Sequence, residues 1–167
     1  MPENKNNEEQ MIAGSDYLKR SQGVSSAPFE AYLNFGYALL AIAGADGDVP
    51  ESEMNWLINH QRMIGAPEEA IAQYKTFDYK NAKLEDLLPK IKADVPNFSA
   101  PRTLLYYAIK MSRADKDYAV EEQEAVKKAA KLLGVGNDIT LALNTLVEME
   151  EKVDSMRKAL ILTETLS

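Results

Sequence analysis

The feature that most constrains the fold of this chain is an acidic motif, Asp-x-Asp-x4-Glu, that occurs twice at a spacing of 69 residues. Asp46, Asp48 and Glu53 form the first acidic corner, and Asp115, Asp117 and Glu122 form the second. The flanking residues match at the same spacing: Ala45 with Ala114, Leu57 with Val126, Met63 with Leu132, Ile64 with Leu133 and Gly65 with Gly134. Each copy has the order apolar helix, acidic turn, helix, glycine. The repeat predicts a pseudo-symmetric helical domain with two acidic corners.

The periodicity of apolar residues predicts an all-α fold. From Phe29 to Ala45 apolar residues recur at helical spacing and small residues fill most of the gaps, which is typical of a central helix. Prolines and glycines predict the next helices at about 50–64, at about 67–74 and at 84–93, the last one short or kinked at Pro89. A second core helix is expected around 104–111 and its successor over 120–133. No stretch alternates with period two, so we expect no sheet.

The two ends of the chain differ from this repeat. Residues 1–27 are rich in Asn, Glu, Ser and Gln, and we interpret them as a flexible polar arm in which Met11-Ile12 and Tyr17-Leu18 could form one docked turn. Residues 28–167 are expected to form a single helical domain that includes a long C-terminal helix over about 138–165.

The C-terminal helix carries apolar residues at heptad spacing. They are Ile139, Ala142, Leu146, Met149, Val153, Met156, Leu160 and Thr163. One interpretation is a long helix that wraps the domain. The other is a surface for a partner protein or a homodimer, because an apolar stripe that extends past the domain needs cover.

Composition excludes several classes of function. The net charge of −7 argues against nucleic acid binding, which requires clustered Lys and Arg. The chain has no cysteine and one histidine, His60, so disulfides, a zinc site and a catalytic triad are not expected. For His60 we expect a surface or packing role. The N-terminus does not resemble a signal peptide, and the longest apolar run, 35–45, is too short to cross a membrane. We therefore expect a soluble cytoplasmic protein without direct membrane insertion.

The acidic corners have two interpretations. Three carboxylates around a turn can supply the oxygen ligands of a divalent cation, Ca²⁺ or Mg²⁺ above all. Alternatively, acidic residues at a helix N-terminus stabilise the helix dipole without binding an ion. The spacing differs from that of an EF-hand loop, since Pro50 and Glu51 occupy its fifth and sixth positions. In the second corner Lys116 replaces the glycine of the first and adds a positive charge. No nucleophile–base pair or phosphate-binding loop accompanies these carboxylates, so we expect no enzymatic activity.

The segment from Ala41 to Glu53, with its Ala-Asp-Gly helix end and acidic helix start, resembles the signature of TerB-like tellurite-resistance proteins. The segment from Ala108 to Glu122, followed by Lys131-Leu132-Leu133-Gly134-Val135, is similar to the second repeat of that family. The resemblance covers about 29–146. It implies an all-α fold in which the two corners come together, and divalent-cation binding by Asp46, Asp48 and Glu53 and by Asp115, Asp117 and Glu122.

The resemblance also implies a non-enzymatic role in bacterial stress responses to tellurite, often in membrane-associated complexes. We therefore expect an adaptor that binds divalent cations and partner proteins. The alternative is a metal-independent interaction module, similar to a co-chaperone, that docks through its C-terminal helix. TerB-like domains occur in proteins with several roles, so fold transfers more safely than function.

Overall fold

The computed structural model describes residues 10–45, 47–114 and 120–162, and it divides into two compact units. One unit ends at Ala100 and the other begins at Pro101. The division lies inside the region 28–167 that the sequence assigns to one domain. It falls at the start of the second helix–turn–helix repeat.

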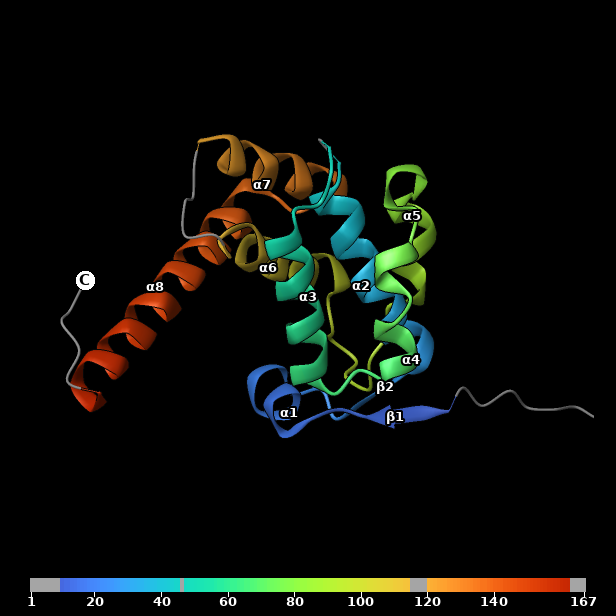
Figure 1. The fold of residues 1–167 in the computed structure, drawn as a ribbon, viewed down its shortest axis with the longest axis horizontal. Helices are drawn as coiled ribbons and strands as arrows, with labels where there is room; N and C mark the ends of the chain where they lie inside the picture. Colours follow the sequence, from blue (N-terminus) through green and yellow to red (C-terminus); the bar gives the residue numbers. More distant parts are fainter. Residues whose placement is uncertain (1–9, 46, 115–119, 163–167) are drawn as a thin grey trace, which may run out of the picture. The chain divides into compact units, whose positions relative to one another are not determined.

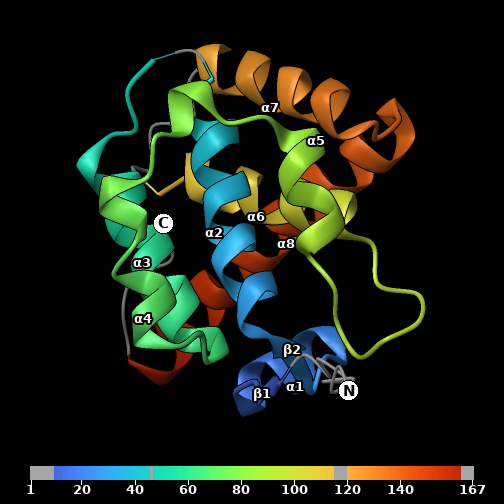
Figure 2. The same cartoon turned by 90° about the vertical axis from the view of Figure 1, so that its right-hand side faces the viewer.

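The first unit contains the first repeat together with the elements on either side of it, up to Ala100 (Figure 1). Its elements are β1 (Met11–Ala13), α1 (Asp16–Gln22), β2 (Ser26–Pro28), α2 (Phe29–Ala43), α3 (Glu51–Ile64), α4 (Glu68–Ile71), the 3-10 helices η1 (Tyr74–Thr76) and η2 (Tyr79–Asn81), α5 (Leu84–Leu87) and the 3-10 helix η3 (Leu88–Lys90). Helix α2 is central: Figure 2 shows α3 and α4 on one side of it and α5 on another. The short α5–η3 segment agrees with the kink expected at Pro89.

Close approach to α2 depends on its small residues. A Cβ atom at Gly36 would collide with the ring of Tyr74, and a Cβ atom at Gly44 would collide with the ring of Tyr79. The Tyr74 side chain is fully buried, and its hydroxyl donates to the carbonyl oxygen of Tyr32 at 2.9 Å and accepts from Nε2 of Gln61 at 2.8 Å. Burial raises the pKa of this phenol. The predicted central helix is therefore confirmed, together with the reason for its small side chains.

The polar arm expected over 1–27 needs correction in its described part. Strands β1 and β2 pair antiparallel, with Ile12 opposite Ala27, and α1 lies between them. The side chain of Ser15 caps α1, and Leu18 is buried where α1 packs near α3. Val24 and Ala27 are buried as well. The described part of this segment is therefore packed and not a free arm, and the small sheet differs from the expectation of helices alone.

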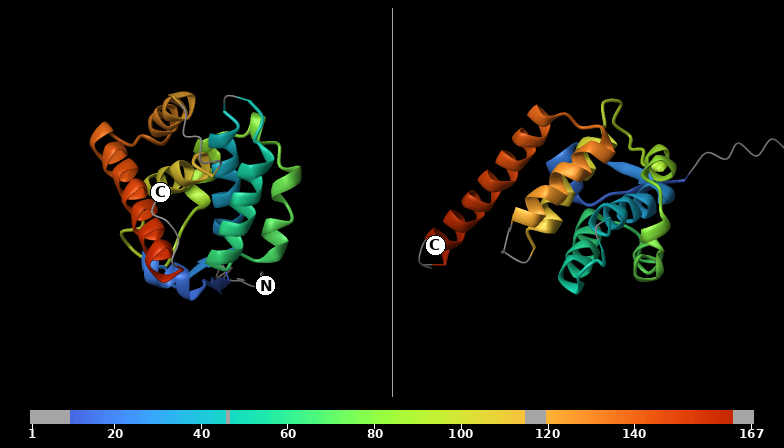
Figure 3. Two further views of the ribbon diagram at one scale, coloured as in Figure 1. Left: turned by 60° about the vertical axis from the view of Figure 1, so that its left-hand side comes forward. Right: turned by 90° about the horizontal axis from the view of Figure 1, so that it is seen from above.

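The second unit consists of three helices, α6 (Ala100–Ser112, whose first residue belongs to the other unit), α7 (Val120–Leu133) and α8 (Asn137–Ile161). The start of α8 lies beside α7, and its C-terminal half continues past α7 (Figures 1 and 3). The long C-terminal helix expected over about 138–165 is present as α8, within the residues that the structure describes.

The sequence repeat is also a structural repeat. Both second helices end on a glycine in the left-handed conformation, Gly65 with φ 93° and Gly134 with φ 69°. Hydrogen bonds of the ends of α2 and α3 recur 69 residues later. The pairs are Gly44 N–H to Leu40 O and Arg113 N–H to Ile109 O, Ala45 N–H to Ile42 O and Ala114 N–H to Met111 O, and Ala66 N–H to Gln61 O and Val135 N–H to Ala130 O. The two units therefore contain the same helix–turn–helix design, as the motif predicted.

Candidate functional site

The first acidic corner connects α2 and α3, and η2 supports it from the same unit. Gly47 has φ 155°, near the limit of the left-handed region, and Pro50 occupies the N-cap of α3 without a side-chain capping bond. The backbone N–H of Val49 donates to the hydroxyl oxygen of Tyr79 at 3.1 Å. Segment η2 lies about thirty residues further along the chain. The hydrogen bond from Val49 to Tyr79 thus holds the turn, and the sequence around the turn gives no sign of this partner.

The ion pair of Asp48 is the main electrostatic feature of this corner. The Nζ atom of Lys80 lies 2.5 Å from the carboxylate of Asp48, whose side chain is 83% exposed. The hydrogen bond and charge of Lys80 lower the pKa of Asp48, and the carboxylate in turn raises the pKa of Lys80. Sequence reasoning missed Lys80, because no periodic or motif signal links η2 to the corner.

Of the other predicted metal ligands, the structure describes only Glu53 in full. Glu53 lies in the first turn of α3, on the C-terminal side of the corner. Asp46, and Asp115, Lys116 and Asp117 of the second corner, lie outside the described residues, and so does the side chain of Glu122. Within the described part of the chain, no three acidic or histidine side chains are arranged to hold a metal ion. Cation binding at either corner therefore stays a prediction.

A groove of about 510 Å³ lies between α3 and α4. Its lining residues are Asn55, Ile58, Asn59, Arg62, Glu68, Ile71, Ala72 and Lys75. The guanidinium of Arg62 binds Glu68 at 2.9 and 3.2 Å, and it lowers the pKa of that carboxyl. None of these residues belongs to the acidic motifs, so the groove supplies no link between the corners and a substrate. On the buried side of α3, His60 is 3% exposed, and its ring stacks on the ring of Trp56 with 5.0 Å between the ring centroids. His60 therefore has a packing role, one of the two roles expected for it.

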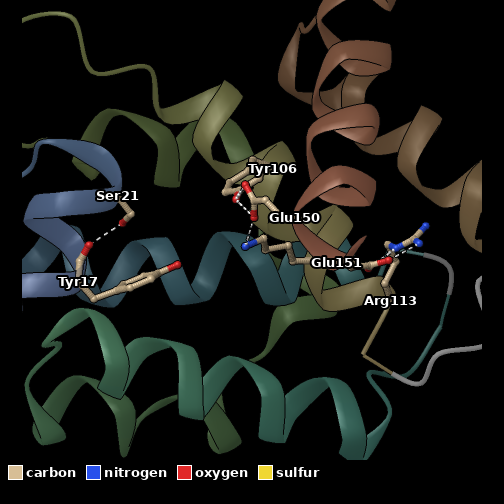
Figure 4. Close-up of polar contacts among 7 residues, drawn as sticks. Tyr17, Ser21, Tyr106, Arg113, Glu150 and Glu151 are labelled. Atoms are coloured by element: carbon tan, nitrogen blue, oxygen red, sulfur yellow. Dashed lines mark hydrogen bonds and ion pairs between the residues drawn. The ribbon is translucent and has the colours of Figure 1, made fainter. Parts of the chain in front are cut away.

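In the second unit, polar side chains clamp α8 to α6 near the middle of α8 (Figure 4). The hydroxyl of Tyr106 lies 2.5 and 2.6 Å from the two carboxylate oxygens of Glu150, and Nζ of Lys110 lies 2.7 Å from the same carboxylate. Arg113 binds Glu151 through two contacts of 2.6 Å. The three α6 residues recur every three or four positions, so they form one face of that helix.

This clamp fixes which face of α8 is left open. Thr140 and Val147, on the inner face, are buried, and Glu150 lies at the edge of that face. The heptad residues from Ala142 to Leu160 lie on the opposite face and are exposed, Ile139 is only partly exposed, and Thr163 lies outside the described residues. We call five of them the outer stripe: Leu146, Met149, Val153, Met156 and Leu160, with exposed fractions of 43, 60, 55, 55 and 73%. The heptad pattern therefore marks a surface of α8 and not the side that packs against the rest of its unit.

Two comparisons with known proteins gave no match, since neither a protein-family model nor a curated protein sequence matches this chain. The described helices include none that is long and apolar enough to cross a membrane. Among solved structures, the chain is similar to a tellurite resistance protein from Nostoc punctiforme PCC 73102, with a TM-score of 0.78 and 24% sequence identity. The similarity covers 89% of this chain and 91% of that chain. The TerB-like all-α fold implied by the family resemblance is thereby confirmed as the fold of this chain.

Proposed function

We propose that this chain is a non-enzymatic stress-response protein of the tellurite-resistance type that works in the cytoplasm as an adaptor and docks a partner protein through the outer stripe of α8. The observation that carries the proposal is the exposure of the outer stripe, where each side chain is at least 43% exposed. Stable soluble proteins rarely leave a continuous row of large apolar side chains in water without a use for it. The name of the structural neighbour supports the type of stress.

The α6–α8 clamp supports the same proposal. A helix with a free apolar face would gain by turning that face toward its own unit. The ion pairs of Glu150 and Glu151 with α6 oppose this rotation, because turning α8 would separate all of these charged contacts at once. The clamp therefore acts as a device that presents the outer stripe to a partner.

Growth in the presence of tellurite tests this function. Deletion of the coding gene in its own organism should increase sensitivity to tellurite, and the wild-type chain should restore growth. A chain carrying Met156→Glu should fail to restore it, because a charge in the outer stripe opposes burial against a partner. Leu132→Glu is the matched control, since Leu132 is 58% exposed on α7 and lies outside the stripe. Full restoration of growth by the Met156→Glu chain would exclude the outer stripe as the docking surface. A deletion strain whose sensitivity to tellurite is unchanged would exclude tellurite as the stress.

Divalent-cation binding at the first acidic corner is a second proposal. Its support is the exposed Asp48 carboxylate on the Gly47 turn, next to the first turn of α3. In this proposal Ca²⁺ or Mg²⁺ competes with Lys80 for Asp48. Calorimetric titration of chelator-stripped protein should give saturable binding that Asp46→Ala/Asp48→Ala abolishes and Lys80→Met strengthens. No heat at millimolar ion would leave the carboxylates with a role in helix capping alone.

A further inference from the structure

We propose that the outer stripe of α8 is covered by the outer stripe of a second copy of this chain, with the two helices antiparallel and a two-fold axis between Val153 and Met156. This inference rests on the proposed use of the stripe as a docking surface, and it names the occupant.

The spacing of the stripe suits packing against itself. Steps of three and four residues keep apolar side chains on one line along a helix, which is the pattern of helices that pair by inserting side chains between one another. In the antiparallel pair, Val153 meets Met156 of the second copy and Met149 meets Leu160 of the second copy. The two-fold axis repeats both contacts. Every exposed side chain from Met149 to Leu160 on the stripe is then covered, and each copy uses the same surface.

The charges beside the stripe set the direction of the two helices. Glu150 and Arg157 flank the stripe on one edge, and Lys152 and Ala159 flank it on the other. If the helices were parallel, Lys152 would lie beside Arg157 of the second copy, and the two positive charges would repel each other. In the antiparallel arrangement, Glu150 lies beside Arg157 of the second copy on both sides of the axis, and Lys152 lies beside the small Ala159.

The same charges set the register. A shift of one heptad toward the N-terminus would place Glu150 against Glu150 and Lys152 against Lys152 of the second copy. A shift of one heptad toward the C-terminus would place Arg157 against Arg157. Only the proposed register combines opposite charges with cover of the stripe from Met149 to Leu160, and like charges held in contact discriminate against the alternatives.

Glu150 can take part in both the clamp and the dimer. Its side chain keeps 38% of its surface exposed while it binds Lys110, and a carboxylate can accept about four hydrogen bonds. The side chain of Arg157 is 56% exposed, and it binds Asp154 of its own helix at 3.2 Å in an exposed pair of small energy. Both groups are therefore accessible to a second copy.

The predicted interface is short. It spans little more than two heptads, so it belongs at the lower end of specific interfaces, where about 1,200 Å² or less is buried, and we expect a dissociation constant in the micromolar range. Because two of its contacts are ion pairs at the edge, dimerisation should weaken as salt is added.

Sedimentation velocity of the full chain tests whether the dimer forms. Between about 1 and about 200 μM the mass should rise from that of the 18.6 kDa chain toward twice that value. Val153→Glu should keep the protein monomeric over this range while its helical circular dichroism stays unchanged, since Val153 is 55% exposed and does not support the fold. Leu132→Glu, on α7, should dimerise like the wild type. A wild-type chain that stays monomeric at the highest concentration would overturn the inference.

Cysteine cross-linking tests the direction and the register, and the chain has no cysteine of its own. Under mild oxidation, a mixture of Met149→Cys and Leu160→Cys proteins should give a cross-linked dimer. Met149→Cys alone should not, because its two sulfurs would lie about 16 Å apart along the axis. Cross-linking of Met149→Cys with itself would show parallel helices or a different register, and either would overturn the proposed arrangement.

The outcomes separate this inference from the proposed function. If the wild type is monomeric while Met156→Glu still fails to restore growth on tellurite, the docking role stands and a different protein occupies the stripe. If the chain dimerises as described but Met156→Glu restores growth fully, the dimer stands and the docking role fails.

Discussion

Gly36 lies where α2 closely approaches Tyr74 of η1. A methyl group there would overlap the ring of Tyr74, which cannot move easily because its hydroxyl is held by Tyr32 and Gln61 in a buried site. We therefore expect Gly36→Ala to lower the free energy of unfolding by about 1–3 kcal/mol, even though alanine favours helices more than glycine does. Urea denaturation measures this change.

Gly136→Ala is the control for that measurement. Gly136 caps α8 at a negative φ, and no atom lies within 4 Å of an added Cβ. Because glycine is preferred over alanine at an N-cap, this substitution should lower the free energy of unfolding by less than about 1 kcal/mol, without any clash. Equal effects of the two substitutions would show that the ring of Tyr74 does not limit the approach to α2.

The Asp48–Lys80 pair makes a prediction about pH. Because Lys80 lowers the pKa of Asp48, the pair stabilises the folded protein above the ordinary aspartate pKa of 3.8, and this contribution disappears as the pH falls through the lowered value. Lys80→Met should move the pKa of Asp48 back up toward its ordinary value. Carboxyl chemical shifts followed by NMR titration measure the change. Lys75→Met is the control on the neighbouring η1, and a pKa of Asp48 that does not respond to Lys80→Met would refute the pair.

At this scale the sequence located Asp48 and Glu53 in the chain but not what they contact, and their role as cation ligands stays a prediction. Asp48 and Glu53 were assigned from a local motif, and local spacing does place them around one turn. Lys80 and Tyr79 reach that turn from η2, a short 3-10 segment without apolar periodicity. Contacts between distant loops leave no regular pattern in a single sequence, which explains why these two partners were missed.

The α6–α8 clamp makes a prediction for a helix as a whole. Arg113 has an 18% exposed side chain and forms two contacts with Glu151, so its planar group matches the carboxylate in a way that lysine cannot. We expect Arg113→Lys to speed hydrogen exchange of α8 amides beyond Val147, because the helix loses a fixed point of attachment. A double-mutant cycle with Glu151→Gln should give a coupling of about 0.5–1 kcal/mol.

Arg157→Lys provides the comparison for this clamp. Arg157 pairs only with Asp154 of its own helix among the ion pairs that the described residues form, so exchange in the middle of α8 should not respond. If Arg113→Lys and Arg157→Lys gave the same exchange rates, α8 would not depend on α6 for its position.

Elements with strong local signals were predicted well. Pro50 and Gly65 bound α3, Pro89 falls at the change from α5 to η3, and Gly134 ends α7, because backbone constraints of proline and glycine act within a few residues. For the N-terminal segment the sequence suggested only one docked turn, formed by Met11-Ile12 and Tyr17-Leu18; these residues lie in β1 and α1, and the pairing of β1 with β2 was missed. The two strands have three residues each, too few to show an alternation, and their stability comes from pairing with each other and from the burial of Leu18.

For the whole molecule, the duplicated motif predicted the organisation of the fold, which the pattern of no single helix could predict. A repeat at 69 residues requires two similar units, and the matching hydrogen bonds at the helix ends of both repeats follow from this duplication. The heptads of α8 were the ambiguous part of the sequence. A row of apolar residues has the same pattern in a core as on a binding surface, and only the clamp of Glu150 and Glu151 to α6 identifies the face that stays open.

The dimer proposed for α8 links the stability of the whole molecule to its concentration. A contact made only by folded chains stabilises them by mass action, so the midpoint of thermal unfolding should rise with protein concentration. Each tenfold increase above the dissociation constant should add about 1.4 kcal/mol per dimer, which is about 0.7 kcal/mol per chain. The Val153→Glu variant should not show this dependence. Its midpoint at every concentration should equal that of dilute wild-type protein, because in this proposal Val153 makes its stabilising contact only with a second copy. Differential scanning calorimetry at several concentrations measures both effects, and a wild-type midpoint that does not move with concentration would contradict the dimer.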